Sequence, residues 1–399
     1  MNLADLSRLI SPDMAEATRL TRAGNLAEAA ALLQRGLSGG PAPVPAAARP
    51  TAPAPPARPR ILDIDPETGE VLEPAATRPA QPSGTPLRGL LDRLAAGLPN
   101  GVPNGLSGGF PGGRAAAAEA PLPAGARFLS LTHAGPAGRR DYRLYVPASL
   151  GAAPAPLLVM LHGCTQSPED FAAGTRMNEL AEQHGMLVAY PGQTQAANAQ
   201  KCWNWFNAAD QGRDRGEPAL IAGIARDVLR EHGADPARVF VAGLSAGGAA
   251  AAIMGQAYPE LFAAIGVHSG LACGAARDMP GAFAAMRQGG ATAGGRPVPA
   301  IVFHADRDST VHPRNADQVM AQAAGPGLRA TTTQGQVPGG HAFTRTTHAD
   351  AAGRVLQEQW LVHGGGHAWS GGSAAGSYTD PRGPDASAEI VRFFLGLAS

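Results

Sequence analysis

The string Gly-Leu-Ser-Ala-Gly at residues 243–247 is the clearest candidate for chemistry in this chain. It lies between a short apolar run at 239–242 and a stretch of small residues that favours a helix. A serine in a sharp strand-to-helix turn needs glycine on either side, because a side chain at those positions would collide with the turn. This context indicates that Ser245 is a nucleophile. The alternative is a noncatalytic glycine-rich turn, which has some weight in a chain with 52 glycines.

A serine nucleophile needs an imidazole base and a carboxylate that orients it, and with this turn they follow in the order Ser, Asp or Glu, His. Downstream, the loop after an apolar run holds two candidate acids, Asp306 and Asp308. Spacing alone does not choose between them, and loop capping is the alternative role for each. Near the C-terminus, His367 is preferred as the base over His363, because it lies deeper in a glycine-rich loop.

The oxyanion that serine attack creates on an ester carbonyl needs two N–H donors. We expect one to be the backbone N–H of Ala246, directly after the serine, and the other to come from a loop after an earlier strand. The stretch HGCTQ supplies that loop, with the N–H of Cys164 as donor and Gly163 permitting close approach. The Cys164 thiol is not expected to be the nucleophile, because no paired imidazole is evident.

Two tryptophans occur in the polar stretch CWNWF at 202–206, where large rings are costly unless they line something. We expect Trp203 and Trp205 to wall an acyl pocket and bind substrate. Trp369, beside the proposed base, is expected in the same wall. The alternative is that the rings pack a loop.

The chain has three cysteines, too few for a disulfide scaffold, and no cysteine–histidine cluster has the spacing of a metal site. Cys164 and Cys202 are hypothesised to be close enough for a disulfide, since one lies in the proposed oxyanion loop and the other beside the wall tryptophans. The alternative is that both thiols stay reduced, because no export signal is visible. Cys273 is expected to remain unpaired.

Composition divides the chain into three parts. Residues 1–38 have the apolar spacing of amphipathic helices and are interpreted as a helical segment, either an appendage or a surface-docking module. Residues 39–120 are rich in Pro, Ala and Gly and predict a disordered linker, with one weak helix at 87–98. Residues 121–399 are expected to form one catalytic domain.

The last part alternates short apolar runs with helical patterns, which predicts βαβ units. The fold class is therefore α/β, with a mostly parallel sheet flanked by helices, and its chemistry is expected at the carboxyl ends of the strands. Two alternating segments at 126–135 and 139–150 predict an antiparallel pair before it. Further strands are expected within 156–163, 185–192, 238–245, 262–270 and 299–306, and helices at 177–184, 218–232, 246–257, 315–324 and 386–397.

A net charge of +0 with only 16% charged residues disfavours nucleic acid, an anionic membrane or an acidic substrate as partner. No apolar run is long enough to span a membrane. The N-terminus lacks the basic start and continuous apolar stretch of a signal peptide, so the sequence shows no export route.

With HGCTQ, CWNWF, GLSAGG, HADRDSTV and HGGGHAWSGG in this order, residues from about 125 to 399 closely resemble the poly(3-hydroxybutyrate) depolymerase family of esterases. The resemblance implies an α/β-hydrolase fold with Ser245 as nucleophile and His367 as base. It selects Asp308 over Asp306 as the acid, although Ala305 stands where the family pattern has glycine.

The resemblance also implies a serine esterase without metal or cofactor, acting on short-chain hydroxyalkanoate esters or poly(3-hydroxybutyrate). A feruloyl or acetylxylan-type esterase is the alternative within the class, and a noncatalytic granule-binding scaffold is the alternative outside it. Residues 1–38 are the candidate contact with a granule or polymer surface. The family favours an extracellular location, whereas the missing export signal favours a cytoplasmic one.

Overall fold

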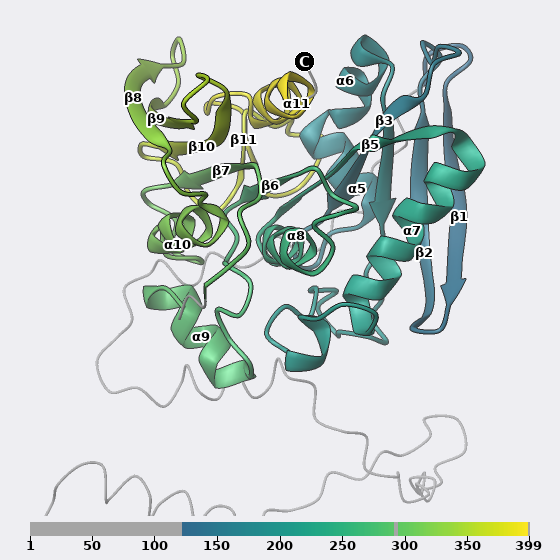
Figure 1. The fold of residues 1–399 in the computed structure, drawn as a ribbon, viewed down its shortest axis with the longest axis horizontal. Coiled ribbons are helices and arrows are strands. Elements are labelled where there is room, and N and C mark those ends of the chain that lie inside the picture. Colours follow the sequence, from purple (N-terminus) through teal and green to yellow (C-terminus); the bar gives the residue numbers. More distant parts are fainter. Residues whose placement is uncertain (1–121, 291–293, 398–399) are drawn as a thin grey trace, which may run out of the picture. The chain divides into compact units, whose positions relative to one another are not determined.

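The computed structural model describes residues 122–290 and 294–397 (Figure 1). The helical segment predicted at 1–38, the linker predicted at 39–120 and its weak helix at 87–98 lie outside the described residues. Those three predictions therefore stay predictions.

A mixed sheet forms the centre of the described domain. Its ten strands are β1 (Arg127–Gly135), β2 (Gly138–Val146), β3 (Ala155–Leu161), β4 (Leu187–Pro191), β5 (Ala234–Leu244), β6 (Ala264–His268), β7 (Ala300–Ala305), β8 (Arg329–Gln336), β9 (Ala342–Ala349) and β10 (Val355–Val362). They lie in the order β1-β2-β4-β3-β5-β6-β7-β10-β9-β8. The run from β4 to β10 is parallel, whereas β1, β2, β8 and β9 pair antiparallel at the two edges.

Helices cover both faces of this sheet (Figure 1). They are α5 (Pro168–Thr175), α6 (Met177–His184), α7 (Gly216–His232), α8 (Ala246–Ala257), α9 (Met279–Gln288), α10 (Arg314–Ala323) and α11 (Ala386–Gly396), with a short 3-10 helix η1 (Ala208–Asp210). Alternate residues of β3 point into two separate apolar clusters, Leu157 with α7, α8 and α10, and Leu158 with α5, α6 and α11. Burial on both faces explains why the central strands are apolar throughout instead of alternating.

The α/β class is confirmed, and the helices predicted at 177–184 and 246–257 have those bounds in the structure. The sequence did not predict five strands, β8 to β10 and the short parallel pair β11 (Trp369–Ser370) and β12 (Thr379–Asp380), or the helices α5 and α9. The edge strand β8 is nearly all exposed and has no apolar alternation. Pairing with β9 forms this strand, as in the contact between the hydroxyls of Thr332 and Thr346 at 3.1 Å.

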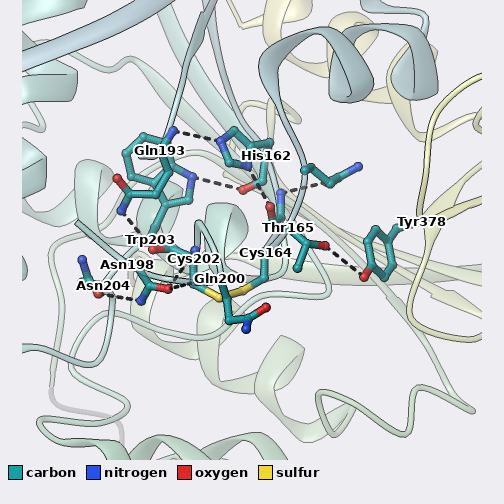
Figure 2. The surroundings of a disulfide bond; sticks show 12 residues. His162, Cys164, Thr165, Gln193, Asn198, Gln200, Cys202, Trp203, Asn204 and Tyr378 are labelled. Atoms are coloured by element: carbon teal, nitrogen blue, oxygen red, sulfur yellow. Dashed lines mark hydrogen bonds between the residues drawn. A yellow bond between two sulfur atoms is a disulfide. The ribbon is translucent and has the colours of Figure 1, made fainter. Parts of the chain in front are cut away.

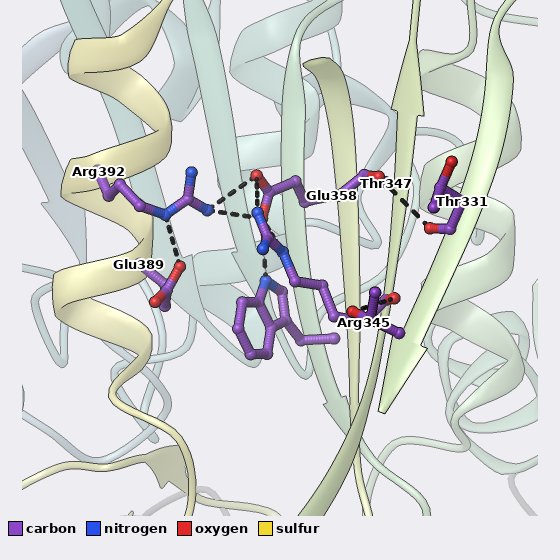
Figure 3. A network of polar contacts seen from close by, with 8 residues as sticks. Thr331, Arg345, Thr347, Glu358, Glu389 and Arg392 are labelled. Atoms are coloured by element: carbon purple, nitrogen blue, oxygen red, sulfur yellow. Dashed lines mark hydrogen bonds and ion pairs between the residues drawn. The ribbon is translucent and has the colours of Figure 1, made fainter. Parts of the chain in front are cut away.

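An ion-pair network around the buried Glu358 joins β9, β10 and α11 (Figure 3). Glu358 of β10 is 1% exposed and accepts hydrogen bonds from Arg345 Nε and a terminal nitrogen at 3.0 and 2.9 Å. A terminal nitrogen of Arg392 donates to both Glu358 oxygens at 2.8 and 2.7 Å. The indole N–H of Trp360 also donates to Glu358, at 3.2 Å. The network fixes the C-terminal helix to β10, whose end leads into the loop of His367.

Candidate active site

Ser245 occupies the junction of β5 and α8 in a strained backbone conformation. Its φ is 58° and its ψ is −119°, a region that residues with a Cβ rarely adopt. The backbone N–H of Ser245 donates to the carbonyl of His268 at 2.9 Å, which helps to hold the turn. The serine side chain thus sits at the end of a central strand and at the start of a helix, the geometry of a nucleophile elbow.

The glycines around Ser245 are required by close backbone contacts. A Cβ on Gly243 would lie 2.4 Å from the carbonyl carbon of Gly247. A Cβ on Gly247 would lie 1.9 Å from the carbonyl oxygen of Leu161 at the end of β3. The same contacts bring the loop after β3 directly against the elbow.

The candidate acid and base meet at this edge of the sheet. Strands β5, β6, β7 and β10 are parallel neighbours, so the segments that follow them emerge together. Nδ1 of His367, after β10, lies 2.7 Å from Oδ2 of Asp308, after β7. The Asp308 side chain is fully buried, and that of His367 is 13% exposed.

The surroundings of Asp308 favour its ionised form. Its Oδ1 accepts the backbone N–H groups of Thr310 and Val311 at 2.9 and 2.8 Å. Burial alone would raise the pKa of this carboxyl, but the contacts of His304 and His367 with Oδ2 outweigh burial and hold the pKa well below its ordinary value. Asp308 therefore offers His367 a negatively charged oxygen in a fixed position.

The rival residues form a second, more exposed pair. Nδ1 of His363 lies 3.0 Å from Oδ2 of Asp306, and Oδ1 of Asp306 accepts the N–H of Gly364 at 2.7 Å. Nε2 of His363 contacts the hydroxyl of Thr344 at 2.8 Å. The two side chains are 38% and 37% exposed. The structure thus pairs each candidate acid with its own histidine, and both pairs lie on the same two loops.

His268, at the end of β6, connects the elbow to the loop of the base. Its carbonyl accepts the N–H of Ser245, and its Nε2 accepts the N–H of Ser370 at 2.9 Å. Its ring stacks on that of Trp369 with centroids 5.0 Å apart. Burial lowers the pKa of His268 to about 3, so it remains neutral and keeps Nε2 as an acceptor.

The two proposed oxyanion donors lie on adjoining segments. Ala246 is the first residue of α8, so its N–H has no acceptor within that helix. Cys164 lies in the loop after β3 and is joined to Cys202 by a disulfide with Cα atoms 4.2 Å apart (Figure 2). Cys273 is a free cysteine, and burial raises the pKa of its thiol to about 11.

The three tryptophans expected in a pocket wall are buried in the structure. Trp203, Trp369 and Trp205 are 0%, 1% and 6% exposed. The indole N–H of Trp203 donates to the carbonyl of His162 at 3.1 Å, and that of Trp369 to the hydroxyl of Ser387 at 3.0 Å. The expectation that they wall an acyl pocket and bind substrate stays a prediction. These rings pack beneath the loops, which is the alternative that the polar sequence around them did not favour.

One residue that sequence reasoning passed over is Gln166, the last residue of HGCTQ. Its Oε1 accepts the N–H of Gly163 at 2.9 Å, and its Nε2 donates to Asp170 at 2.9 Å. Gln166 therefore anchors the oxyanion loop to α5. The position of Gln166 in the string HGCTQ was the only sequence signal for this role.

Two negative findings concern the described residues 122–290 and 294–397. His, Cys, Asp and Glu side chains there form no group of three or more that could hold a metal ion. No helix in these ranges has both the length and the apolar character needed to cross a bilayer.

Comparison with known proteins gives a consistent result. Poly(3-hydroxyalkanoate) depolymerase C of Paucimonas lemoignei is 32% identical over 239 residues, which are 56% of this chain and 57% of that protein. Feruloyl esterase B of Neurospora crassa is 29% identical over 232 residues, 52% of this chain and 77% of that protein. The chain thus spans little more than half the length of the depolymerase.

Among solved structures, the acetyl xylan esterase from Aspergillus awamori shares the fold. The match has a TM-score of 0.52 at 22% identity and covers 68% of this chain and 99% of that one. The family model described as esterase PHB depolymerase matches residues 140–332, which include the elbow and Asp308. Residues 140–332 therefore match the PHB depolymerase family of esterases, and the described domain has the α/β-hydrolase fold.

Proposed function

We propose that this protein is a carboxylic ester hydrolase that works through an acyl-enzyme on Ser245. The observation that carries the proposal is the 2.7 Å contact between His367 Nδ1 and the buried Asp308, at the sheet edge where the strained Ser245 lies. The match of residues 140–332 to an esterase family model supports the reaction class.

In the proposed mechanism, Ser245 Oγ attacks the ester carbonyl carbon while His367 Nε2 takes the hydroxyl proton. The N–H groups of Ala246 and Cys164 stabilise the oxyanion of the tetrahedral intermediate. His367 then gives the proton to the leaving alkoxide, which leaves an acyl group on Ser245. Water attacks this acyl-enzyme while His367 takes its proton, and His367 then returns that proton to Ser245 Oγ as the acid product departs. Asp308 holds Nδ1 protonated throughout, and the scheme needs no metal or cofactor.

The proposed substrates are short-chain hydroxyalkanoate esters or poly(3-hydroxybutyrate). The depolymerase match, at 32% identity against 29% for the feruloyl esterase, supports this choice over a feruloyl or acetylxylan ester. The disulfide between Cys164 and Cys202 supports an oxidising, extracellular compartment. Docking of residues 1–38 on a granule or polymer belongs to the same proposal, with a noncatalytic granule-binding scaffold as its rival.

The test is hydrolysis of p-nitrophenyl butyrate, amorphous poly(3-hydroxybutyrate), a feruloyl ester and acetylated xylan, assayed in parallel. Ser245→Ala and His367→Ala should each remove nearly all hydrolysis, and the double variant should lose little more, because a triad acts as a unit. Ser130→Ala, at an exposed serine of β1, is the control and should retain full activity. A Ser245→Ala variant with more than about a tenth of the normal rate would contradict the mechanism, since about 10⁴-fold is expected. Granule binding without any hydrolysis would favour the scaffold.

A further inference from the structure

Two residues with strained backbones meet beside the loop that follows β3. Thr165 and Tyr378 have φ values of 67° and 54°, in the left-handed region that residues with a Cβ seldom adopt. The hydroxyl of Thr165, the residue after Cys164, lies 3.2 Å from the phenol hydroxyl of Tyr378 (Figure 2). Strained residues collect at active sites and in segments that hold ligands, so this pair indicates a role beyond packing.

The backbone on both sides of Tyr378 is held by other segments. The N–H of Ser377 donates to Asp170 of α5 at 3.0 Å, and the carbonyl of Tyr378 accepts the N–H of Trp369 at 2.7 Å. The pairing of β11 with β12 adds to this restraint. Since Trp369 is two residues after His367, Tyr378 presents its phenol from a fixed position between the loop of the base and the loop after β3.

Thr165 is held as firmly and is exposed. Its N–H donates to the carbonyl of Gln200 at 2.6 Å, and the disulfide to Cys202 restrains the preceding residue, Cys164. The exposure of Thr165 makes its side chain accessible to a ligand. The hydroxyl is thus in place before a ligand binds.

The contact between the two hydroxyls leaves Thr165 with a hydrogen to donate. One hydroxyl of such a pair donates to the other, and a phenol is a stronger donor than an alcohol, so Tyr378 is the donor here. Within residues 122–290 and 294–397, the Thr165 hydroxyl has no second partner. Its own hydrogen is therefore available to an acceptor atom of a substrate.

The order of residues in the loop relates this donor to the ester that is cleaved. Cys164 supplies the proposed N–H for the carbonyl oxygen, and Thr165 follows it directly, with consecutive Cα atoms about 3.8 Å apart. In a 3-hydroxyacyl ester, the oxygen on C3 is three bonds from the carbonyl carbon, which is a comparable span. Neighbouring residues of one loop can thus hold both oxygens of such an acyl group.

We propose that Thr165, oriented by Tyr378, recognises the C3 oxygen of 3-hydroxyacyl esters. The Thr165 hydroxyl donates to that oxygen, which is a hydroxyl in a monomer and an ester oxygen within a polyester. Tyr378 acts through Thr165 and is a positioning residue. The inference rests on the proposed function and narrows its substrate class, because neither a feruloyl nor an acetyl group carries an oxygen on C3.

The test compares esters that differ only at C3. Ethyl 3-hydroxybutyrate, ethyl butyrate and ethyl 3-methylbutyrate carry a hydroxyl, a hydrogen and a methyl group there. Release of acid is measured with the full-length protein, and each enantiomer of the hydroxy ester is assayed separately, because a fixed donor favours one of them. We expect kcat/KM for the better enantiomer to exceed that for either other ester about tenfold, near the upper value for one neutral hydrogen bond.

Two variants of Thr165 separate its hydroxyl from its shape. Thr165→Val keeps a β-branched side chain at the strained position and removes the hydroxyl, so the preference for the hydroxy ester should disappear. Thr165→Ser keeps the hydroxyl and should stay within about threefold of the wild-type preference, and Tyr378→Phe, which only removes the partner that orients Thr165, should lower it about threefold. Each value is a ratio between two esters on one protein, so a general loss of activity through distortion of the loop cancels. Thermal unfolding and nonreducing mass mapping check that the fold and the disulfide remain intact.

The proposal is wrong if the wild type hydrolyses these esters without preferring the hydroxy ester, a result that needs no variant. It is also wrong if a folded Thr165→Val variant keeps the preference, or if a folded Thr165→Ser variant loses it as completely as Thr165→Val does. A wild-type protein that hydrolyses none of the three ethyl esters and no p-nitrophenyl butyrate would refute the proposed function instead.

Discussion

The replacement Asp308→Asn tests the triad with a change of one atom. Oδ1 of Asp308 accepts two backbone N–H groups, from Thr310 and Val311. The amide of asparagine must keep its oxygen in that position, so its NH₂ group takes the place of Oδ2. That group then faces Nδ1 of His367, which is 2.7 Å from Oδ2 in the structure.

Two facing donors force His367 into the other tautomer. Nδ1 of His367 becomes an acceptor and the ring proton moves to Nε2. Since Nε2 is the atom that must accept the proton of Ser245, the ring can no longer act as the base. We expect kcat to fall about 10⁴-fold, which corresponds to about 5.5 kcal/mol of transition-state stabilisation. KM should change little, because neither Asp308 nor its amide touches the substrate.

The assay is steady-state hydrolysis of p-nitrophenyl butyrate, and Asp306→Asn is the matched control. Asp306 is also paired with a histidine but is 37% exposed, so its variant should lose activity only a few-fold. Circular dichroism and the unfolding midpoint show whether each variant is folded. If Asp308→Asn retains more than a tenth of the activity, or if Asp306→Asn is the more damaging change, the assignment of the acid is refuted.

Three further predictions concern stability and are measured by urea unfolding. Glu358→Gln should lower the free energy of unfolding by about 3 kcal/mol, because it leaves two arginines facing a neutral amide. Its control is Glu389→Gln, which changes a more exposed partner of Arg392 and should lower the free energy of unfolding by less than about 1 kcal/mol. The Cys164–Cys202 disulfide closes a loop of 38 residues, so its reduction should lower the free energy of unfolding by about 4 kcal/mol in the chain-entropy model. An unchanged free energy of unfolding after reduction would contradict this prediction. The buried His162 has a pKa of about 4 when folded against 6.5 in a model peptide, so the unfolded chain binds more protons below pH 6.5. The contribution of His162 to the free energy of unfolding should be fully present above pH 6.5 and should fall by about 3 kcal/mol as the pH is lowered towards 4. A free energy of unfolding that rises on acidification would contradict the burial of His162 as a neutral ring.

Local sequence was sufficient to predict the central strands, several of the helices and the glycines of the elbow. Apolar runs of strand length predicted the central strands, and helical spacing predicted 177–184 and 246–257 with their observed bounds. The need for the glycines of the elbow could also be predicted, because they contact backbone segments whose order the α/β pattern already implies. Each of these features depends on residues close together in the chain.

Contacts between distant segments were decided only by the tertiary structure. The residue types left Asp306 and Asp308 equivalent, and the fold distinguishes them by burying Asp308 against His367 while leaving Asp306 half exposed beside His363. Edge strand β8 depends on its pairing with β9, so its own sequence carries little signal.

The tryptophans show the same limit most clearly. Their polar neighbours suggested the wall of an acyl pocket but did not indicate that Trp203 is buried against the loop after β3, where its N–H donates to the carbonyl of His162. Composition around a residue describes its neighbours in the chain, whereas burial depends on which strands and loops the sheet order brings over it. For the same reason, the hydrogen bond from His162 to the Gly163 carbonyl could be recognised only once the buried partner of its other ring nitrogen, the N–H of Gln193, was in place.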